Sequence, residues 1–356
     1  MKEYLFNIQF FGTAGLNETT DATTGSNDLS PEMQVFYKTQ LIEHAKPELY
    51  YNKYCDHQNI PKGNGKTIQV RRFTAFPAAT DTLEEGVTPT GQDLNVDEYH
   101  ETLNQYGGYI KQTDLLEMTA VDPIIAEDTE LCADQMALTL DTVTRDVAVA
   151  TLNKVWSPKI VSGVVTPINQ RSSMNETCLP TADDFRKIAA ILKANNTKKI
   201  DGSYIAIVHP HIAADLMKTA PENAWIDVSK YKRPEQIEEG ELGKMYGIRF
   251  FESSNAKIWN DNTCPVKTAA AGSTPATYYS VYGTIVFGKH AYMSTDLEGA
   301  GSEIIAKQLG SGGSEDPLNQ RSSVGWKATH CAALLASEYM VCLESCSSFS
   351  GESEAN

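Results

Sequence analysis

The sequence predicts an α+β protein of two or three compact units, and three observations support this prediction. The chain has 356 residues, more than one typical domain holds. Its hydrophobic fraction of 41% is ordinary for a globular protein and is enough for a sizeable core. One long amphipathic helix is predicted in the first half, whereas short helices and strands intermix in the second half.

The charge balance is strongly acidic, with 30 basic and 46 acidic residues and a formal net charge of -16. Such a chain does not bind nucleic acid through a broad basic face. If it lies beside packed DNA, it would therefore enclose the DNA as a wall and would not bind it tightly. The same charge helps to keep separate copies soluble.

Cysteine usage and the absence of targeting signals indicate a reducing compartment. The number of cysteines is odd and no CxxC pair occurs, which disfavours both a disulfide framework and a zinc site. The chain shows no signal peptide and no apolar run of the ~18 residues that span a bilayer. We expect a cytoplasmic protein with buried or incidental thiols at Cys55, Cys132, Cys178, Cys264, Cys331, Cys342 and Cys346.

The first 111 residues predict an arm and a two-stranded projection. Residues 12–30 are polar and too poor in apolar surface to fold alone. A helix is expected over Pro31–Ala45. Lys66–Phe73 and Glu98–Lys111 are strand-like and flank a polar loop, Thr74–Asp97, which is too long for the inside of a compact domain. Because an isolated hairpin is marginal in water, it should rest on something else.

Asp122–Val155 predicts the longest helix of the chain. Asp122 is a suitable N-cap, and Pro123 suits the first helical position. About 30 residues at ~1.5 Å each give a rod of ~45 Å, which is long enough to serve as a spine. Its apolar stripe has spacings of 3, 4 and 7 and consists of Ile125, Cys132, Met136, Leu140, Val143 and Val147.

The second half predicts a mixed α+β or α/β unit. Helices are expected from Thr181 and over His211–Met217. A glycine-rich break is expected at Gly310–Gly313, and the tail from Ser347 should fray. Strands are expected over Ser203–Val208, Tyr246–Glu252, Tyr278–Phe287 and Gly325–Leu343.

Motifs that could carry chemistry have simpler structural explanations. Gly63–Thr67 ends like a phosphate-binding loop, but Ile60 stands where that motif needs glycine, and a strand follows where a helix should begin. A tight turn is the better interpretation. His209 and His211 lack further zinc ligands nearby and are better explained by the start of a helix after a strand. Cys342 and Cys346 fit core thiols.

No arrangement of residues typical of an enzyme stands out. The chain has no GxSxG elbow and no paired-carboxylate motif. Asp183 and Asp184 fit the first turn of a helix, where the helix dipole favours acids. We therefore predict no catalytic residues, no cofactor and no metal.

Several short segments, taken in this order of parts, resemble one family. The chain resembles the major capsid proteins of tailed bacteriophages, which have the HK-97-type fold, and in particular the N-four-like capsid subfamily. No single segment is decisive, but together they cover nearly the whole chain. The segments are Asn7–Phe11 (NIQFF), Leu83–Pro89 (LEEGVTP), Gln105–Asp114 (QYGGYIKQTD), Gly240–Gly243 (GELG), Tyr246–Ser253 (YGIRFFES), Asp316–Arg321 (DPLNQR) and Val324–Ala328 (VGWKA).

The resemblance implies a division of the chain and a structural role. That role is self-assembly into the hexamers and pentamers of an icosahedral head, formed in the host cytoplasm and enclosing double-stranded DNA without specific binding. Scaffolding, portal and decoration proteins are further partners that it allows, and no membrane is involved. The implied parts are an N-terminal arm (1–55), an E-loop hairpin (56–111), a P-domain with the spine helix (112–175), an A-domain (176–299), a return to the P-domain (300–346) and an acidic tail (347–356).

The candidate contacts between subunits lie on the hairpin. Arg71 and Arg72 are adjacent on a strand, so their side chains point to opposite faces. At least one should leave the subunit's own body and could meet Glu84 or Glu85 of a neighbour, and Phe76 is a further candidate. The simpler alternative is two solvated arginines, because exposed ion pairs contribute little.

Two other functions remain open from the sequence. A soluble α/β enzyme could use residues 74–97 as a long lid, but it would need a polar pocket with convergent titratable groups. Another phage structural component, such as a tail protein, fits the long helix followed by a mixed domain less well.

Overall fold

The computed structural model describes residues 49–356 except 75, 81, 83–84, 89–90, 120–123, 220–239, 269–276, 299–301, 312–315 and 352–354. The predicted polar arm and the helix predicted over Pro31–Ala45 lie outside the described residues. The described chain divides into two units. Unit 1 contains residues 105–139 and 300–329, and unit 2 contains residues 47–104, 140–299 and 330–356.

Unit 1 is a small sheet covered on one face by a helix. Its strands are β16 (Ser302–Lys307), β17 (Arg321–Leu334) and β4 (Asn104–Thr113), with β17 in the middle. From Ser322 to His330 the even-numbered side chains of β17 are buried, and the Trp326 indole donates a hydrogen bond of 2.8 Å to Gln135 of helix α2. The alternation therefore places α2 on the even-numbered face of the sheet.

Helix α2 (Ile124–Val149) confirms the predicted spine helix but ends earlier than expected. Its 26 residues give a rod of ~39 Å. After Val149 the chain leaves the helix and forms β5 (Lys154–Trp156), where Val155 pairs with Leu343 in a parallel strand. The predicted end at Val155 is wrong because a long-range strand pairing competes with the helix. A one-turn-and-a-half helix, α1 (Asp114–Thr119), precedes α2.

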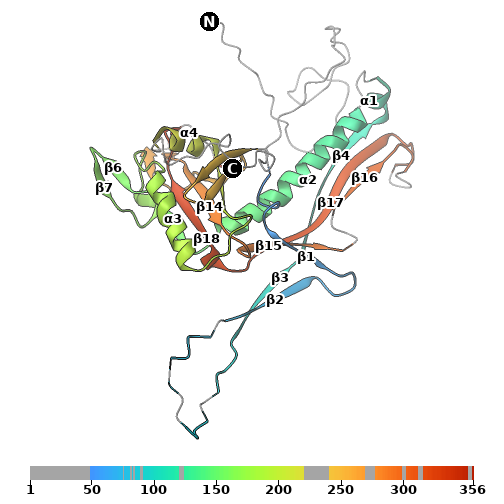
Figure 1. Ribbon diagram of the computed structural model, residues 1–356. Coiled ribbons are helices and arrows are strands. Elements are labelled where there is room, and N and C mark those ends of the chain that lie inside the picture. The colour runs from blue at the N-terminus through green and yellow to red at the C-terminus, as the bar shows by residue number, and fades with distance from the viewer. Residues whose placement is uncertain are drawn as a thin grey trace. The chain divides into compact units, whose positions relative to one another are not determined.

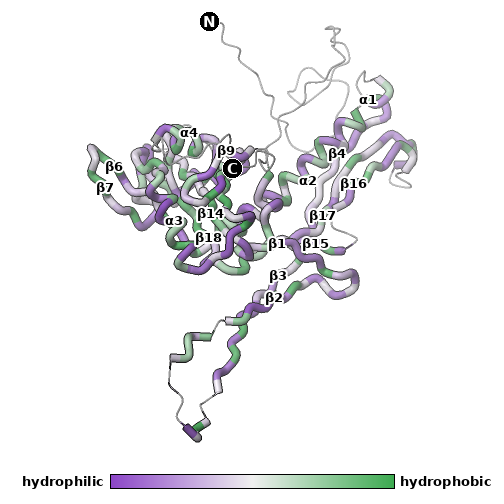
Figure 2. Tube along the Cα trace, in the orientation of Figure 1, coloured by the Kyte–Doolittle hydropathy of each residue, from purple (hydrophilic) through white to green (hydrophobic). Residues whose placement is uncertain are grey.

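Unit 2 is built on a mixed sheet in the order β5-β18-β14-β8-β10-β9, with the short β11 beside β14. Its paired strands β14 and β18 are labelled in Figure 1. Every residue of β8, β14 and β18 is buried, which agrees with strands covered on both faces. Figure 2 shows hydrophobic residues concentrated in this part of the chain. The strands are β8 (Tyr204–Val208), β9 (Glu241–Met245), β10 (Ile248–Glu252), β11 (Ile258–Trp259), β14 (Val281–Phe287) and β18 (Met340–Ser345).

Alternate residues of this sheet build two separate cores. On one face Ala206 and Val208 pack with α3 (Ala182–Ala194) and α4 (Pro210–Thr219). On the other face Ile205 and Ile207 pack with the last turn of α2 and with the segment from Tyr50 to Cys55. The sheet therefore separates the two short helices from the end of the spine helix.

Helix α3 begins where the sequence predicts. Thr181 caps it through a hydrogen bond from the Asp184 backbone N–H to the Thr181 hydroxyl, and the Asp184 carboxylate accepts from the Thr181 backbone in return. This is a capping box, which satisfies two N–H groups at the helix start. The predicted role of Asp183 and Asp184 in a first helical turn is confirmed.

The remaining strands of unit 2 form short ribbons around the main sheet. β1 (Asp56–Ile60) runs parallel to β15 (Tyr292–Leu297), which pairs with the C-terminal end of β17. Two 3-10 turns lie at Arg171–Ser173 and Ser337–Tyr339. The hairpins are β2 (Thr67–Phe73) with β3 (Val96–Thr102), β6 (Lys159–Val161) with β7 (Val164–Thr166), and β12 (Val266–Thr268) with β13 (Thr277–Tyr278).

Several of the predicted strands need correction. The strand predicted over Gly325–Leu343 is two strands, β17 and β18, which belong to different sheets and are separated by the turn at Ser337–Tyr339. Tyr246 and Gly247 are not in a strand: with φ values of 51° and 85° they form the turn between β9 and β10. Glu98–Lys111 is likewise two strands, β3 and β4, which are broken at Leu103.

The expectation that the tail from Ser347 frays is also wrong. Ser347 and Ser350 are buried, and the Asp215 carboxylate accepts hydrogen bonds from the Ser347 hydroxyl (2.7 Å) and from the Ser348 N–H (2.8 Å). These hydrogen bonds hold the first residues of the tail against α4, and the polar composition of the tail does not reveal them.

All seven cysteines are buried free thiols.

A buried glutamate ties three segments of unit 2 together. The Glu344 side chain is 1% exposed, and its carboxylate accepts two hydrogen bonds from Arg171, at 2.6 and 2.9 Å, and one from the Trp156 indole at 3.0 Å. The Lys154 ammonium lies 3.1 Å away. Burial alone would raise the pKa of Glu344, but the hydrogen bonds and charges of Arg171 and Lys154 outweigh it, so that the pKa is lowered.

We predict that Glu344→Gln destabilises unit 2 by about 3 kcal/mol, because it leaves two cations without their buried counterion. Denaturant unfolding followed by tryptophan fluorescence measures this, since Trp156 reports on the site. Asp183→Asn is the matched control, because Asp183 forms exposed ion pairs that are worth at most about 1 kcal/mol. Equal losses in the two variants would contradict the prediction.

The same cluster predicts a pH dependence. A carboxyl group whose pKa is lowered by folding stabilises the fold above its ordinary pKa, here 4.5, and this stabilisation is lost as the pH falls through the lowered value. The difference in unfolding free energy between wild type and Glu344→Gln should therefore narrow below pH 4.5. A difference that stays constant from pH 7 to about 3 would show that Glu344 does not titrate as expected.

Candidate assembly surfaces

The β2–β3 hairpin is the predicted two-stranded projection. Its strands pair in register from Thr67 opposite Thr102 to Phe73 opposite Val96. The chain reaches β2 through the predicted tight turn, where Gly63 and Gly65 adopt φ values of 93° and 83°. That conformation suits glycine, and the phosphate-loop interpretation is not needed.

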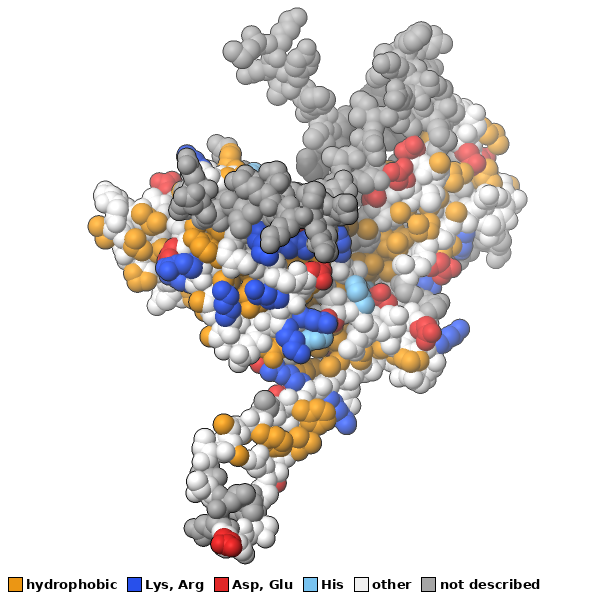
Figure 3. All heavy atoms as spheres, in the orientation of Figure 1, with side chains coloured by type: hydrophobic (Ala, Val, Ile, Leu, Met, Phe, Trp, Pro, Cys, Tyr) orange, Lys and Arg blue, Asp and Glu red, His pale blue; other side chains and the backbone are white. Residues whose placement is uncertain are grey.

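The hairpin exposes large apolar side chains in the isolated chain. Phe73 is 62% exposed and Phe76 53% exposed, and Val87 and Leu94 are similarly open. Figure 3 shows apolar side chains along this hairpin on the visible face of the molecule. An exposed apolar ribbon without a core of its own is typical of a surface that another molecule covers.

Arg71 and Arg72 lie on opposite faces of β2, as predicted, and each has an acidic partner within the chain. Arg71 pairs with Glu98 on the neighbouring strand of the same hairpin at 3.1 Å. Arg72 pairs with Glu338, and its guanidinium also lies over the ring of Tyr339 at 5.3 Å from the centroid. The hydrogen bond between Arg72 and Glu338 raises the pKa of Arg72 and lowers the pKa of Glu338.

Arg72 therefore anchors the root of the hairpin to the turn before β18. Sequence reasoning did not find Glu338, because 266 residues separate it from Arg72 and no local pattern marks it. Glu85 is exposed near the tip, and Glu84 lies outside the described residues. A contact of either glutamate with a neighbour stays a prediction.

A second exposed apolar hairpin, β6–β7, was missed by the sequence analysis. Val161, Val164 and Val165 are exposed on it, and Ser162 and Gly163 form its turn with φ values of 51° and 79°. The Ser-Gly pair between valines is the sequence signal that could have located it. Like the β2–β3 hairpin, it offers apolar surface to another molecule.

The histidines at the start of α4 agree with the structural interpretation. His209 directly follows β8, and α4 begins at Pro210. Burial, and then the neighbouring His211, lowers the pKa of His209 to about 4. In the part of the chain that the structure describes, no group of three or more His, Cys, Asp or Glu side chains could hold a metal ion, and no helix is long and apolar enough to cross a bilayer.

Comparison with known proteins places the fold. No protein family model and no curated protein sequence matches the chain. Solved structures do match it over most of its length. The capsid chain of cyanophage P-SCSP1u has 15% identity and a TM-score of 0.59, and the matched region covers 91% of this chain and 96% of the cyanophage chain. The capsid chain of Ralstonia phage GP4 has 10% identity and a TM-score of 0.64, and the matched region covers 89% of this chain and 96% of the GP4 chain.

A third match is the mature capsid of bacteriophage PhiM1, with 11% identity and a TM-score of 0.55, covering 91% of this chain and 94% of its own. The chain therefore has the α+β HK-97-type capsid fold, as its sequence predicts. Because the identities are low, these matches concern the fold.

We predict that Arg72→Ala loosens the hairpin root while lowering the stability of the chain by at most about 1 kcal/mol, since the pair is partly exposed. Hydrogen exchange of the β2 and β3 amides should become faster, and Glu338→Gln should have the same effect. Arg71→Ala is the control, because its partner Glu98 lies within the hairpin. If Arg71→Ala and Arg72→Ala accelerate exchange equally, Arg72 is not the anchor.

Proposed function

We propose that this chain is the major capsid protein of a tailed bacteriophage. In this proposal copies assemble into hexamers and pentamers of an icosahedral head that encloses double-stranded DNA. One observation carries it: the fold matches phage capsid chains over nearly the whole of this chain and nearly the whole of theirs. A soluble enzyme with a lid loop has no comparable support.

Assembly in this proposal is geometric. Each copy presents different surfaces to different neighbours, and such heterologous contacts close a shell only at the right curvature. The apolar side chains of the β2–β3 hairpin would find their missing core on a neighbouring copy. Phe76, Arg71, Glu84 and Glu85 remain the candidate contacts. Arg71 is paired within the hairpin, with Glu98, whereas Arg72 is paired with Glu338 outside the hairpin. Weak contacts suffice, because many form at once.

The proposal extends to partners and place. The net charge of -16 supports a wall that encloses DNA without specific binding. Assembly would occur in the host cytoplasm and lead to the virion, with scaffolding, portal and decoration proteins as further partners. The motifs quoted from the sequence support membership of the N-four-like subfamily. No catalytic activity, cofactor or metal belongs to the proposed role.

We predict that the expressed protein forms large closed particles or ring-shaped capsomers. Electron microscopy and light scattering at moderate concentration test this, with the scaffolding protein of its phage added if needed. A monomer that persists across concentrations and salt conditions, even with those partners, would refute the proposed function.

We also predict that shortening the hairpin blocks assembly but leaves the subunit folded. Replacing residues 75–94 by Asn-Gly keeps β2 and β3 complete and joins Thr74 to Asn95, which lie opposite each other, by a favoured two-residue turn. The removed side chains that the structure describes are exposed, so the thermal transition of the isolated subunit should hardly change. A large fall in melting temperature with assembly retained would contradict the assignment of this loop to contacts between copies.

A further inference from the structure

Three loops of unit 2 meet at the end of its main sheet where β8 and β10 begin and β14 ends. The loop after α3 and the turn after β14 are joined by a hydrogen bond of 2.8 Å from the Lys289 backbone N–H to the Lys198 carbonyl. The Lys199 ammonium lies beside the turn between β9 and β10, 3.8 Å from where a Cβ on Gly247 would stand. We call this surface the lysine patch and define it by Lys198, Lys199, Lys244 and Lys289.

The charges of the lysine patch are not neutralised within the described part of the chain. Lys198, Lys199 and Lys289 are exposed and Lys244 is half-buried. None of the four ammonium groups lies within 4.0 Å of a carboxylate of a described residue. Burial, and then the nearby charges of Lys199 and Arg249, lower the pKa of Lys244, so like charges crowd at this surface.

The acids that border the lysine patch do not offset it. They are held by other cations: Glu338 by Arg72, Glu241 by Arg249 and Asp56 by His290. Asp201, in the same loop as Lys198, is exposed and forms no ion pair with a described residue. The patch therefore concentrates positive charge on a chain whose net charge is -16, and it suits an anionic ligand.

The composition of the lysine patch favours a phosphate backbone over a protein surface. Interfaces between proteins are depleted in lysine and enriched in aromatic side chains. Tyr246, beside the patch, is 39% exposed, compared with 62% for Phe73 on the β2–β3 hairpin. Lysine ammonium groups neutralise phosphates as point charges and do not read the base sequence. A nucleic acid therefore fits this surface better than a second protein does.

We propose that the lysine patch binds phosphates of double-stranded DNA, weakly and without sequence preference, and so marks the side of unit 2 that faces the enclosed DNA. The inference rests on the proposed function, which supplies the DNA. Four cations fall short of a broad basic face, so each copy contributes little affinity, and many copies in one shell act together. The acids of the surrounding surface repel DNA and confine its contact to the patch.

The test measures the binding of a labelled DNA duplex by fluorescence anisotropy, with the full chain at concentrations below those at which it forms particles. For wild type, a plot of log association constant against log salt concentration should have a slope of roughly -3, because each phosphate contact contributes about -0.9. Lys198→Gln with Lys199→Gln and Lys289→Gln should lose most of this slope and bind at least about tenfold more weakly at low salt. A duplex of different sequence should bind equally.

Lys62→Gln with Lys66→Gln and Lys218→Gln is the matched control. It removes three exposed lysines outside the lysine patch and changes the net charge equally, so it should keep the wild-type slope. Both variants should keep the melting temperature of the wild-type chain, and both should form particles as wild type does.

Three outcomes overturn the inference. Equal losses of slope in the two variants would mean that DNA responds only to net charge. Wild-type chain that does not bind DNA at low salt would have no phosphate site. A patch variant that keeps the slope but no longer forms particles would place the patch in a contact between copies. The binding measurement needs no particles, so a wild-type chain that binds DNA as expected but never assembles counts against the proposed function alone.

Discussion

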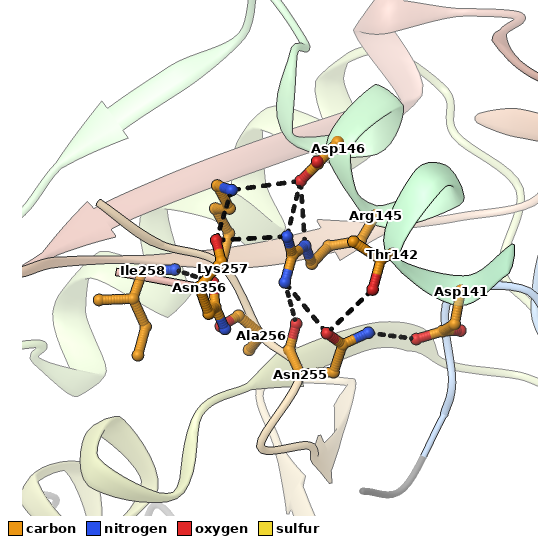
Figure 4. A network of polar contacts seen from close by, with 9 residues as sticks. All are labelled: Asp141, Thr142, Arg145, Asp146, Asn255, Ala256, Lys257, Ile258 and Asn356. Atoms are coloured by element: carbon orange, nitrogen blue, oxygen red, sulfur yellow. Dashed lines mark hydrogen bonds and ion pairs between the residues drawn. The ribbon is translucent and has the colours of Figure 1, made fainter. Parts of the chain in front are cut away.

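Arg145 carries a positive charge into the interior of unit 2, where its side chain is 2% exposed, and the position of α2 in that unit depends on how this charge is held (Figure 4). One guanidinium nitrogen donates to the backbone and side-chain oxygens of Asn255, both at 3.0 Å. The other nitrogens bind Asp146. Because loss of a partner would leave a buried charge unpaired, other positions of the helix are strongly disfavoured.

The network extends beyond the arginine. Asn255 donates to Asp141 at 2.9 Å, and Asp141 accepts from the Asn52 backbone at 3.0 Å. On the other side, the Lys257 ammonium lies 3.4 Å from Asp146. One helical turn and a half of α2 thus fixes both the loop after β10 and the segment before β1. The first part of the same helix belongs to unit 1, where Gln135 accepts the hydrogen bond from the Trp326 indole.

Elements with local causes were predictable from the sequence, and elements with distant causes were not. Thr181 and Asp184 mark the start of α3, and apolar spacing marks α2, because both signals lie within a few turns of the chain. The end of α2 depends on the pairing of Val155 with Leu343. Because Leu343 lies far from Val155 in the sequence, the residues near Val155 do not indicate this pairing. β17 and β18 were fused in the prediction because the break between them, at Ser337–Tyr339, lacks glycine and proline.

The candidate surfaces divide in the same way. The hairpin was predictable, since its loop is polar, long and flanked by two strand patterns, and all of these are local properties. Its anchor at Glu338 was not, and neither was the groove of unit 1 that Lys111, Lys307, Arg321 and Lys327 line. Lys111 and Lys327 lie more than 200 residues apart in the sequence and share one surface only because β4 pairs with β17. A convergence of charges that strand pairing creates requires the fold to be known first.

In the proposed assembly, an acidic chain must associate with copies of itself against a net repulsion. Apolar contacts such as those of Phe73 and Phe76 are not directional and strengthen when salts such as sulfate or phosphate are added. Contacts between exposed charges select a register and weaken as salt screens them. The two kinds of contact lie on one hairpin, with phenylalanines near its root and carboxylates toward its tip. Apolar burial would then supply most of the affinity, while the acids decide which surface of the neighbour the hairpin contacts.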